Sequence, residues 1–140
     1  MAVRRLFVDT SAWDALADSG DPHHETALLF RNDIAGNCKL LVTNYIFDEL
    51  YTLLLMNLGY QQTIHFKRQL EMLIENNLLQ VVWVSKELET EAWTIFEQFN
   101  ADKCWSFTDC VSYAVMRQLG IYEVFAFDRH FEQMGFVRLP

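Results

Sequence analysis

The sequence has few of the features that mark membrane, secreted or metal–thiolate proteins. Its 140 residues contain no uninterrupted apolar run longer than four, which is too short to span a bilayer. Only three apolar residues separate Arg5 from Asp9, so the N-terminal stretch is no signal peptide. The three cysteines are an odd number without metal-binding spacing, which indicates buried thiols in a reducing cytoplasm.

Positive charge is also scarce. Lysine and arginine total 11 against 19 acids, which gives a net charge of −8. This balance disfavours a polyanionic partner unless the negative charge is concentrated where metal ions neutralise it. The hydrophobic content of 51% is that of a globular protein, and the length fits one domain over residues 1–140.

Short apolar runs alternate with helical patterns along the whole chain. Strands are expected at 6–8, 39–43, 79–84 and 124–127, with a short fifth at 136–139. Helices are expected between them, at about 11–18, 22–35, 45–58, 61–75, 86–99 and 106–119. This alternation predicts an α/β fold with three α/β/α layers and a mostly parallel central sheet of four or five strands.

Acidic residues follow the strands of this expected sheet. Asp9 and Asp128 come directly after strands, Glu49 lies early in the next helix, and Asp109 lies in a helical first turn. In a parallel sheet these positions share one edge, where ligands bind. Bare carboxylates that meet there raise one another's pKa and oppose folding, and a divalent cation removes that cost. Such oxygen ligands suit Mg²⁺ or Mn²⁺, and no histidine or cysteine pattern indicates zinc.

Three of these acids also have a purely structural interpretation. Asp9 can lie in a turn before a helix that Ser11 caps. Ser106–Asp109 fits a capping box. Asp128 and Arg129 can form a turn closed by a local ion pair. Each interpretation is reasonable alone, but together with a helix-dipole role for Glu49 they require four coincidences at one edge of the sheet.

Glu49 has a neighbour that competes for the same role. Asp48 and Glu49 are both early-helix acids that complement the helix dipole. Glu49 is preferred because it follows Tyr45 and precedes Leu53 on the stripe expected to face inward. Asp48 is about 100° away around the helix and is expected in solvent.

The same segments exclude several other phosphate sites. No glycine follows the first strand, as a dinucleotide fold or a P-loop requires. The third strand is followed by Val84-Ser85-Lys86, where a response-regulator receiver needs an acid. Ser11 stands where a phosphatase with an aspartyl nucleophile needs its second acid.

Four segments resemble the successive acidic motifs of PIN-domain proteins, most closely the VapC toxins of bacterial and archaeal toxin–antitoxin pairs. They are Phe7–Ser11, Asn44–Leu50, Asp102–Cys110 and Phe127–Phe131. By this resemblance, the metal-binding acid positions are Asp9, Glu49, Asp109 and Asp128, and the supporting hydroxyl positions are Thr10, Ser11 and Thr108. Asp102 and Lys103 fit a narrower subgroup of the family.

The resemblance implies a Mg²⁺- or Mn²⁺-dependent ribonuclease. It also implies an RNA substrate, a homodimer and, for a toxin, inhibition by a small antitoxin encoded alongside. No membrane partner is expected. Basic residues near the site are few for an RNA-binding protein, and Lys103, Arg129 and Lys86 are those the pattern brings close.

The aromatic residues are candidates for a partner-binding surface, and a second function remains open. Trp13, Phe30 and Phe66 are candidates to line an antitoxin groove or a dimer face, although any one of them is more simply a core residue. The alternative function is a non-catalytic interaction protein on the same fold, in which the acids are helix caps. The acidic composition motivates this alternative.

Overall fold

The computed structural model describes residues 3–140 and contains one parallel sheet. Its strands are β1 (Arg4–Val8), β2 (Cys38–Thr43), β3 (Leu79–Val82), β4 (Glu123–Phe125) and β5 (Val137–Leu139). They pair in the order β3-β2-β1-β4-β5, and every pairing is parallel. The predicted fifth strand is thus confirmed.

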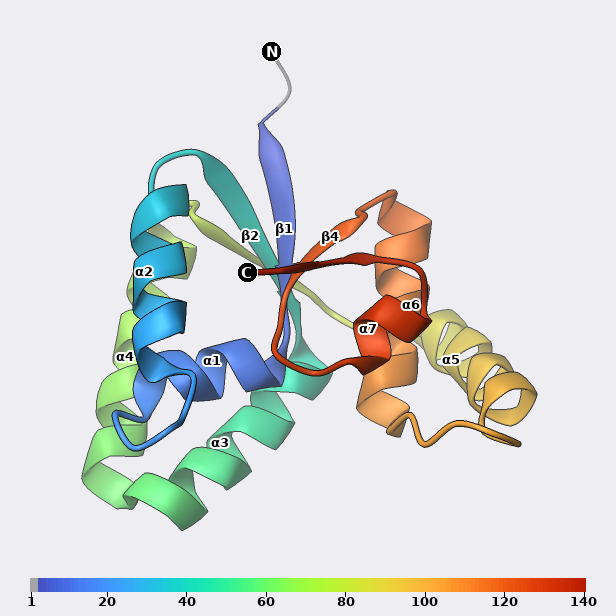
Figure 1. The fold of residues 1–140 in the computed structure, drawn as a ribbon, viewed down its shortest axis with the longest axis horizontal. Coiled ribbons are helices and arrows are strands. Elements are labelled where there is room, and N and C mark those ends of the chain that lie inside the picture. The colour runs from blue at the N-terminus through green and yellow to red at the C-terminus, as the bar shows by residue number, and fades with distance from the viewer. Residues whose placement is uncertain (1–2) are drawn as a thin grey trace.

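Helices connect the strands and cover both faces of the sheet. They are α1 (Thr10–Ala17), α2 (His24–Ile34), α3 (Asn44–Leu58), α4 (Tyr60–Glu75), α5 (Lys86–Phe99), α6 (Phe107–Leu119) and α7 (His130–Gln133). Figure 1 shows α1, α2 and α4 on one side of the strands and α5 and α6 on the other. The predicted three-layer arrangement is therefore confirmed. Within residues 3–140, no helix combines the length and the apolar character needed to cross a membrane.

The core lies on both faces of the central strand. Leu6, Phe7 and Val8 of β1 are almost completely buried, as expected for a strand covered on both sides. In α6, every residue from Asp109 to Met116 is buried. This helix therefore lies in the interior, and the acid that begins its buried stretch is anchored by the core.

The strand order reverses its direction between β1 and β4. The chain proceeds from β1 outward to β2 and β3, then returns to place β4 on the other side of β1. Phe7 and Val8 of β1 pair with Val124 and Phe125 of β4. In open parallel sheets, ligands bind in the crevice at the carboxyl ends of the strands where such a reversal occurs.

Two strands end earlier than predicted, and in each case a side chain accepts the amide group two residues beyond the strand end. β3 ends at Val82, and the Val84 N–H donates to Asn44 Oδ1 at 2.8 Å. β4 ends at Phe125, and the Phe127 N–H donates to Ser11 Oγ at 3.0 Å. Both contacts tie a strand end to the first turn of a neighbouring helix.

Several details of the helix starts differ from prediction. α3 is capped by Thr43, whose hydroxyl accepts the Ile46 N–H, which leaves Asn44 free to bind β3. α2 begins at His24 because Asp21 Oδ1 accepts the His23 N–H in a turn that precedes the helix. The short helix α7 was not predicted.

The cysteines also differ in part from expectation. Cys110 is buried and Cys38 half-buried, but Cys104 is exposed. The prediction that all three thiols are buried is therefore wrong for Cys104, which lies in the loop before α6, outside the packed elements. All three thiols are free.

Candidate active site

The site lies at the carboxyl edge of the sheet, where β1 and β4 are adjacent. Asp9 directly follows β1, and its N–H donates to the Phe125 carbonyl at the end of β4 at 3.0 Å. Ser11 adds a second link, because its hydroxyl oxygen accepts the Phe127 N–H. These hydrogen bonds hold the segment that carries Asp9 against the segment that leads to Asp128.

Asp9 combines a capping role with almost complete burial. It is the N-cap of α1: its Oδ2 accepts the Ser11 N–H at 3.2 Å and the Ser11 hydroxyl at 2.7 Å. The prediction that Ser11 caps this helix is therefore wrong, since Ser11 instead supports the acid. Only 4% of Asp9 is exposed.

The environment of Asp9 favours its protonated form. Burial, the largest cause, raises the pKa of this carboxyl to about 7, while the hydrogen bond from the Ser11 hydroxyl opposes the rise. The charges of Asp109 and Asp128 raise the pKa further. Asp9 therefore lies within electrostatic reach of both acids, although these come from distant parts of the chain.

Asp109 is held at the start of the buried helix α6. It forms the predicted capping box with Ser106: its N–H donates to Ser106 Oγ at 3.0 Å, and its Oδ2 accepts the Ser106 N–H at 3.3 Å. The structural and functional interpretations of Asp109 are thus compatible. Burial is the main cause that raises its pKa, and a hydrogen bond from His130 opposes the rise.

His130 joins Asp109 to Asp128. Its Nδ1 lies 2.7 Å from Asp109 Oδ2 and 3.3 Å from Asp128 Oδ1, and its N–H donates to Asp128 Oδ1 at 2.9 Å. One ligand atom from each of these residues lies within 4.8 Å of the others, a spacing that a metal ion can bridge. The turn of α7 places this histidine over the first turn of α6.

Glu49 does not take the inward position predicted for it. The buried residues of α3 are Ile46, Leu50 and Leu54, so the buried stripe lies one residue away from the predicted one. Glu49 and Asp48 are both exposed. The inward orientation of Glu49 is therefore wrong, and its metal-binding role stays a prediction for a solvent-facing side chain near the same edge.

The predicted supporting hydroxyls have different environments. Ser11 binds Asp9 directly. Thr10 is 5% exposed, and its buried Oγ1 has no hydrogen-bond partner among the described residues. Thr108 is half-buried and directly precedes Asp109 in α6. A buried hydroxyl without a partner is costly, which makes Thr10 a candidate to bind a group that completes the site.

Basic residues contribute little to this edge. Lys103 pairs with Asp102 at 3.1 Å, so the two predicted subgroup residues neutralise each other. Lys86 and Arg129 are exposed. Within residues 3–140, no lysine or arginine forms an ion pair with Asp9, Asp109 or Asp128, and the last two face His130 instead.

Sequence reasoning missed His130. Its signals were its position two residues after Asp128 and its place in the Phe127–Phe131 segment, neither of which assigned it a role. No periodic pattern marks the single-turn helix α7, so the return of this turn over α6 could not be deduced.

Comparison with known proteins identifies relatives over almost the whole chain. A model of the PIN domain matches residues 6–137. The 23S rRNA-specific endonuclease VapC20 of Mycobacterium tuberculosis is 32% identical over 134 residues, which cover 96% of this chain and 97% of the relative. A VapC ribonuclease of Archaeoglobus fulgidus is 27% identical over 126 residues, which cover 89% of this chain and 77% of the relative.

Solved structures show the same fold. The crystal structure of M. tuberculosis VapC20, described as a sarcin–ricin loop cleaving toxin, matches with a TM-score of 0.82. It is 32% identical, and the match covers 94% of this chain and 96% of that chain. The VapBC2 complex of Rickettsia felis, bound to a DNA fragment from its promoter, matches with a TM-score of 0.66 at 10% identity over 96% of this chain and 97% of that chain. The latter likeness concerns the fold alone.

Proposed function

The chain belongs to the PIN-domain family, and on this premise we propose that it is a divalent-metal-dependent ribonuclease, the toxin of a type II toxin–antitoxin pair. The observation that carries the proposal is the cluster of Asp109, Asp128 and His130 at the carboxyl edge of the sheet. Asp9 is tied to the end of β4 beside this cluster, and the charges of Asp109 and Asp128 raise its pKa. The bacterial relative cleaves 23S ribosomal RNA according to its name, which supports RNA as the substrate class.

The residues present fit a divalent cation such as Mg²⁺ or Mn²⁺. Asp9, Asp109 and Asp128 offer carboxylate oxygens, the ligands that these hard cations prefer. The Thr10 hydroxyl, which has no partner among the described residues, and the raised pKa of Asp9 support a cation at this site. A bound cation supplies positive charge that lowers the pKa of an attacking water and stabilises charge on the phosphate oxygens.

The chain's own contribution is to fix the ligands before substrate arrives. Hydrogen bonds anchor one oxygen of each carboxylate: Asp9 Oδ2, Asp109 Oδ2 and Asp128 Oδ1. The second oxygen of each remains available as a ligand. Such pre-organisation avoids reordering of side chains during the reaction. An ionised carboxylate in this group can also accept the proton that the attacking water releases.

The proposal is tested by the neutral variants Asp9→Asn and Asp109→Asn. Both keep the shape of the side chain and an oxygen for its capping bond, so each variant should fold but lose RNA cleavage in the presence of Mg²⁺ or Mn²⁺. Cleavage of ribosomal RNA is measured with and without EDTA. Full activity of either purified variant, or equal activity of the natural protein in EDTA, would exclude the mechanism.

The alternative is a non-catalytic interaction protein. The net charge of −8 and the pairing of Lys103 with Asp102 favour it, because they weaken RNA binding. Calorimetric titration with Mn²⁺ separates the two functions. A nuclease site should give saturable heat that Asp109→Asn removes, whereas acids that serve only as helix caps should give none.

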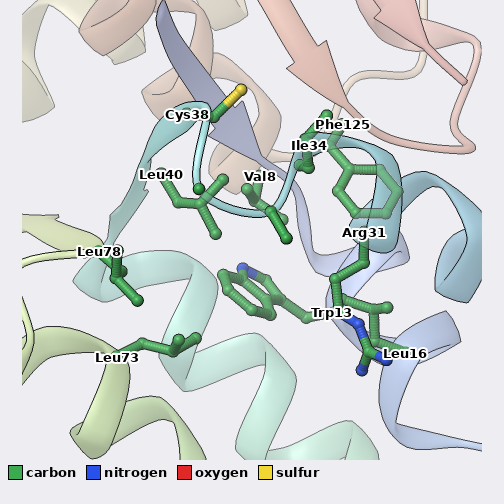
Figure 2. Close-up of a pocket in the computed structure, with 12 residues that line it drawn as sticks. Val8, Trp13, Leu16, Arg31, Ile34, Cys38, Leu40, Leu73, Leu78 and Phe125 are labelled. Carbon is green, nitrogen blue, oxygen red and sulfur yellow. The ribbon is translucent and has the colours of Figure 1, made fainter. Parts of the chain in front are cut away.

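The proposed antitoxin has a surface to bind on the face opposite α5 and α6. A cavity of about 250 Å³ opens between α1, α2 and α4, and Figure 2 shows Trp13 at its centre, with Val8 and Leu40 beside it. A neighbouring groove of about 560 Å³ shares Trp13 and is lined by Phe66. Phe30 instead packs against Phe125 at 4.7 Å between ring centres. We expect an apolar helix of the antitoxin in this groove.

Two further properties belong to the same proposal. A homodimer is expected, and light scattering of the purified chain at micromolar concentration measures it; a strictly monomeric profile would contradict it.

The three free thiols are consistent with function in the reducing cytoplasm, where disulfides rarely form.

A further inference from the structure

A second feature of the carboxyl edge is an exposed aromatic shelf, formed by Trp93 and Phe96 of α5, Phe107 of α6 and Tyr45 of α3. Trp93 stacks on Phe96 with ring centres 5.1 Å apart and an angle of 12° between the planes. Phe107 lies 6.5 Å from Trp93 and 6.0 Å from Tyr45. The three helices therefore present one continuous group of rings.

The shelf is packed against the core on one side and open to solvent on the other. Trp93 remains 51% exposed, whereas Phe96, Phe107 and Tyr45 are half-buried and pack against the core. A shallow hollow of about 370 Å³ lies over it and is lined by Lys86, Glu89, Thr90, Trp93 and Phe107. Since its ring is already held by Phe96, Trp93 loses little conformational freedom when a flat ligand stacks on it.

The shelf and the acidic site share the first turn of α6. Phe107 and Asp109 lie in the same first turn of α6. The hydrogen bond from the Val84 N–H to Asn44 holds the start of α3 at the end of β3, directly before α5 begins. Their side chains project from different sides of this turn, so an RNA strand whose phosphate reaches Asp109 has to pass around the start of α6 to place a nearby base on the shelf.

The hollow is lined by two opposite charges, Lys86 and Glu89, which are three residues apart on one face of α5. Lys86, the first residue of α5, offers a cation to a phosphate group. Glu89 accepts a hydrogen bond from the Tyr45 hydroxyl at 2.5 Å, and its carboxylate repels phosphate but accepts N–H donors of a base. The rings supply the apolar stacking surface that a base prefers to solvent.

From these observations we propose that the aromatic shelf binds one unpaired nucleobase of the RNA, next to the phosphodiester that is cleaved, with the base stacked on Trp93. The proposal rests on the proposed ribonuclease function and adds a recognition subsite to it. It also explains how a chain with few basic residues holds RNA, because stacking does not depend on net charge.

The test measures RNA binding separately from cleavage. In the Asp9→Asn background, fluorescence anisotropy with Mg²⁺ compares a labelled single-stranded oligoribonucleotide with a blunt duplex of the same sequence. Trp93→Ala should weaken single-strand binding by roughly 5- to 150-fold, the range expected for one stacked base, and leave duplex binding unchanged. Trp93→Phe, which keeps an aromatic ring, should retain most of the affinity.

A matched control is Trp83→Ala, since Trp83 is 75% exposed but does not line the hollow. This variant should bind both RNA forms like its parent. Equal loss for single strand and duplex, no loss in Trp93→Ala, or dissociation of a dimer by Trp93→Ala in light scattering would overturn the proposal. The last result would identify the shelf as an interface between two copies. Failure of the nuclease proposal is distinct, because it appears as cleavage that survives Asp9→Asn.

Discussion

Neutralising Asp9 should stabilise the metal-free protein while it removes the proposed metal site. The pKa of this carboxyl is raised from 3.8 to about 7, mainly by burial. The folded state therefore binds the proton more tightly than the unfolded state, and the free energy of unfolding falls as the pH rises from about 4 through about 7. In Asp9→Asn the side chain carries no charge, so this loss disappears.

The magnitude follows from the size of the shift. About three pKa units at 1.36 kcal/mol each give a loss of about 4 kcal/mol above about pH 8, as an upper limit. Globular domains are stable by only about 5–15 kcal/mol, so the effect is a large share of the total. Asn keeps the oxygen that accepts the Ser11 bonds and is a good N-cap residue, so the substitution preserves the cap.

The assay is urea denaturation in EDTA between about pH 5 and about pH 8, followed by fluorescence. The natural protein should lose stability across this range, and Asp9→Asn should lose much less. Asp33→Asn is the matched control, because Asp33 is an exposed acid with the same change of charge. Saturating Mg²⁺ should restore the free energy of unfolding of the natural protein at high pH, and it should not raise that of the Asp9 variant. If Asp9→Asn is no more stable than the natural protein in EDTA at about pH 8, the reasoning is refuted.

Three further substitutions test other contacts. His130→Ala removes a hydrogen bond that lowers the pKa of Asp109, so this pKa should rise. The acidic limb of the pH–rate profile of RNA cleavage should therefore move to higher pH. The control His65→Ala, at an exposed histidine, should leave the profile unchanged. Phe66→Ala should weaken the affinity for the proposed antitoxin, the product of the adjacent reading frame, at least about tenfold in titration calorimetry, and it should leave RNA cleavage unchanged. The control Leu55→Ala, at an exposed leucine, should bind the antitoxin normally. Gly120→Ala should cost about 1 kcal/mol in urea denaturation, because φ is 67° at this helix end while the space around it is open, so a clash cannot add to the cost.

The fold and three of the acids were predictable because they depend on short, strong patterns. The buried run before Asp9 and the alternation of strands with helices fix a parallel sheet, and a parallel sheet places its strand ends at one edge. The capping box of Asp109 marked the start of α6 correctly. At these residues the local sequence pattern and the overall topology predict the same location for the acid.

The rest depended on contacts between distant segments. α3 is apolar around most of its circumference, so its periodicity does not select a buried face, and an error of one residue turned Glu49 inward in the prediction. Ser11 and Asp9 can each cap α1, and the choice is made by Phe127, which uses the Ser11 hydroxyl. His130 reaches Asp109 only because the chain after β4 turns back over α6.

The reversal of strand order between β1 and β4 has a consequence for the living cell. Asp9 is made early in translation and Asp128 late, and the two meet only after the intervening strands and helices have been laid down. A ribosome stalled within the message releases a fragment without the full set of ligands. Under the proposed toxin function, we therefore expect such fragments to be harmless to the cell that makes them, and toxicity to begin only when synthesis has passed Asp128.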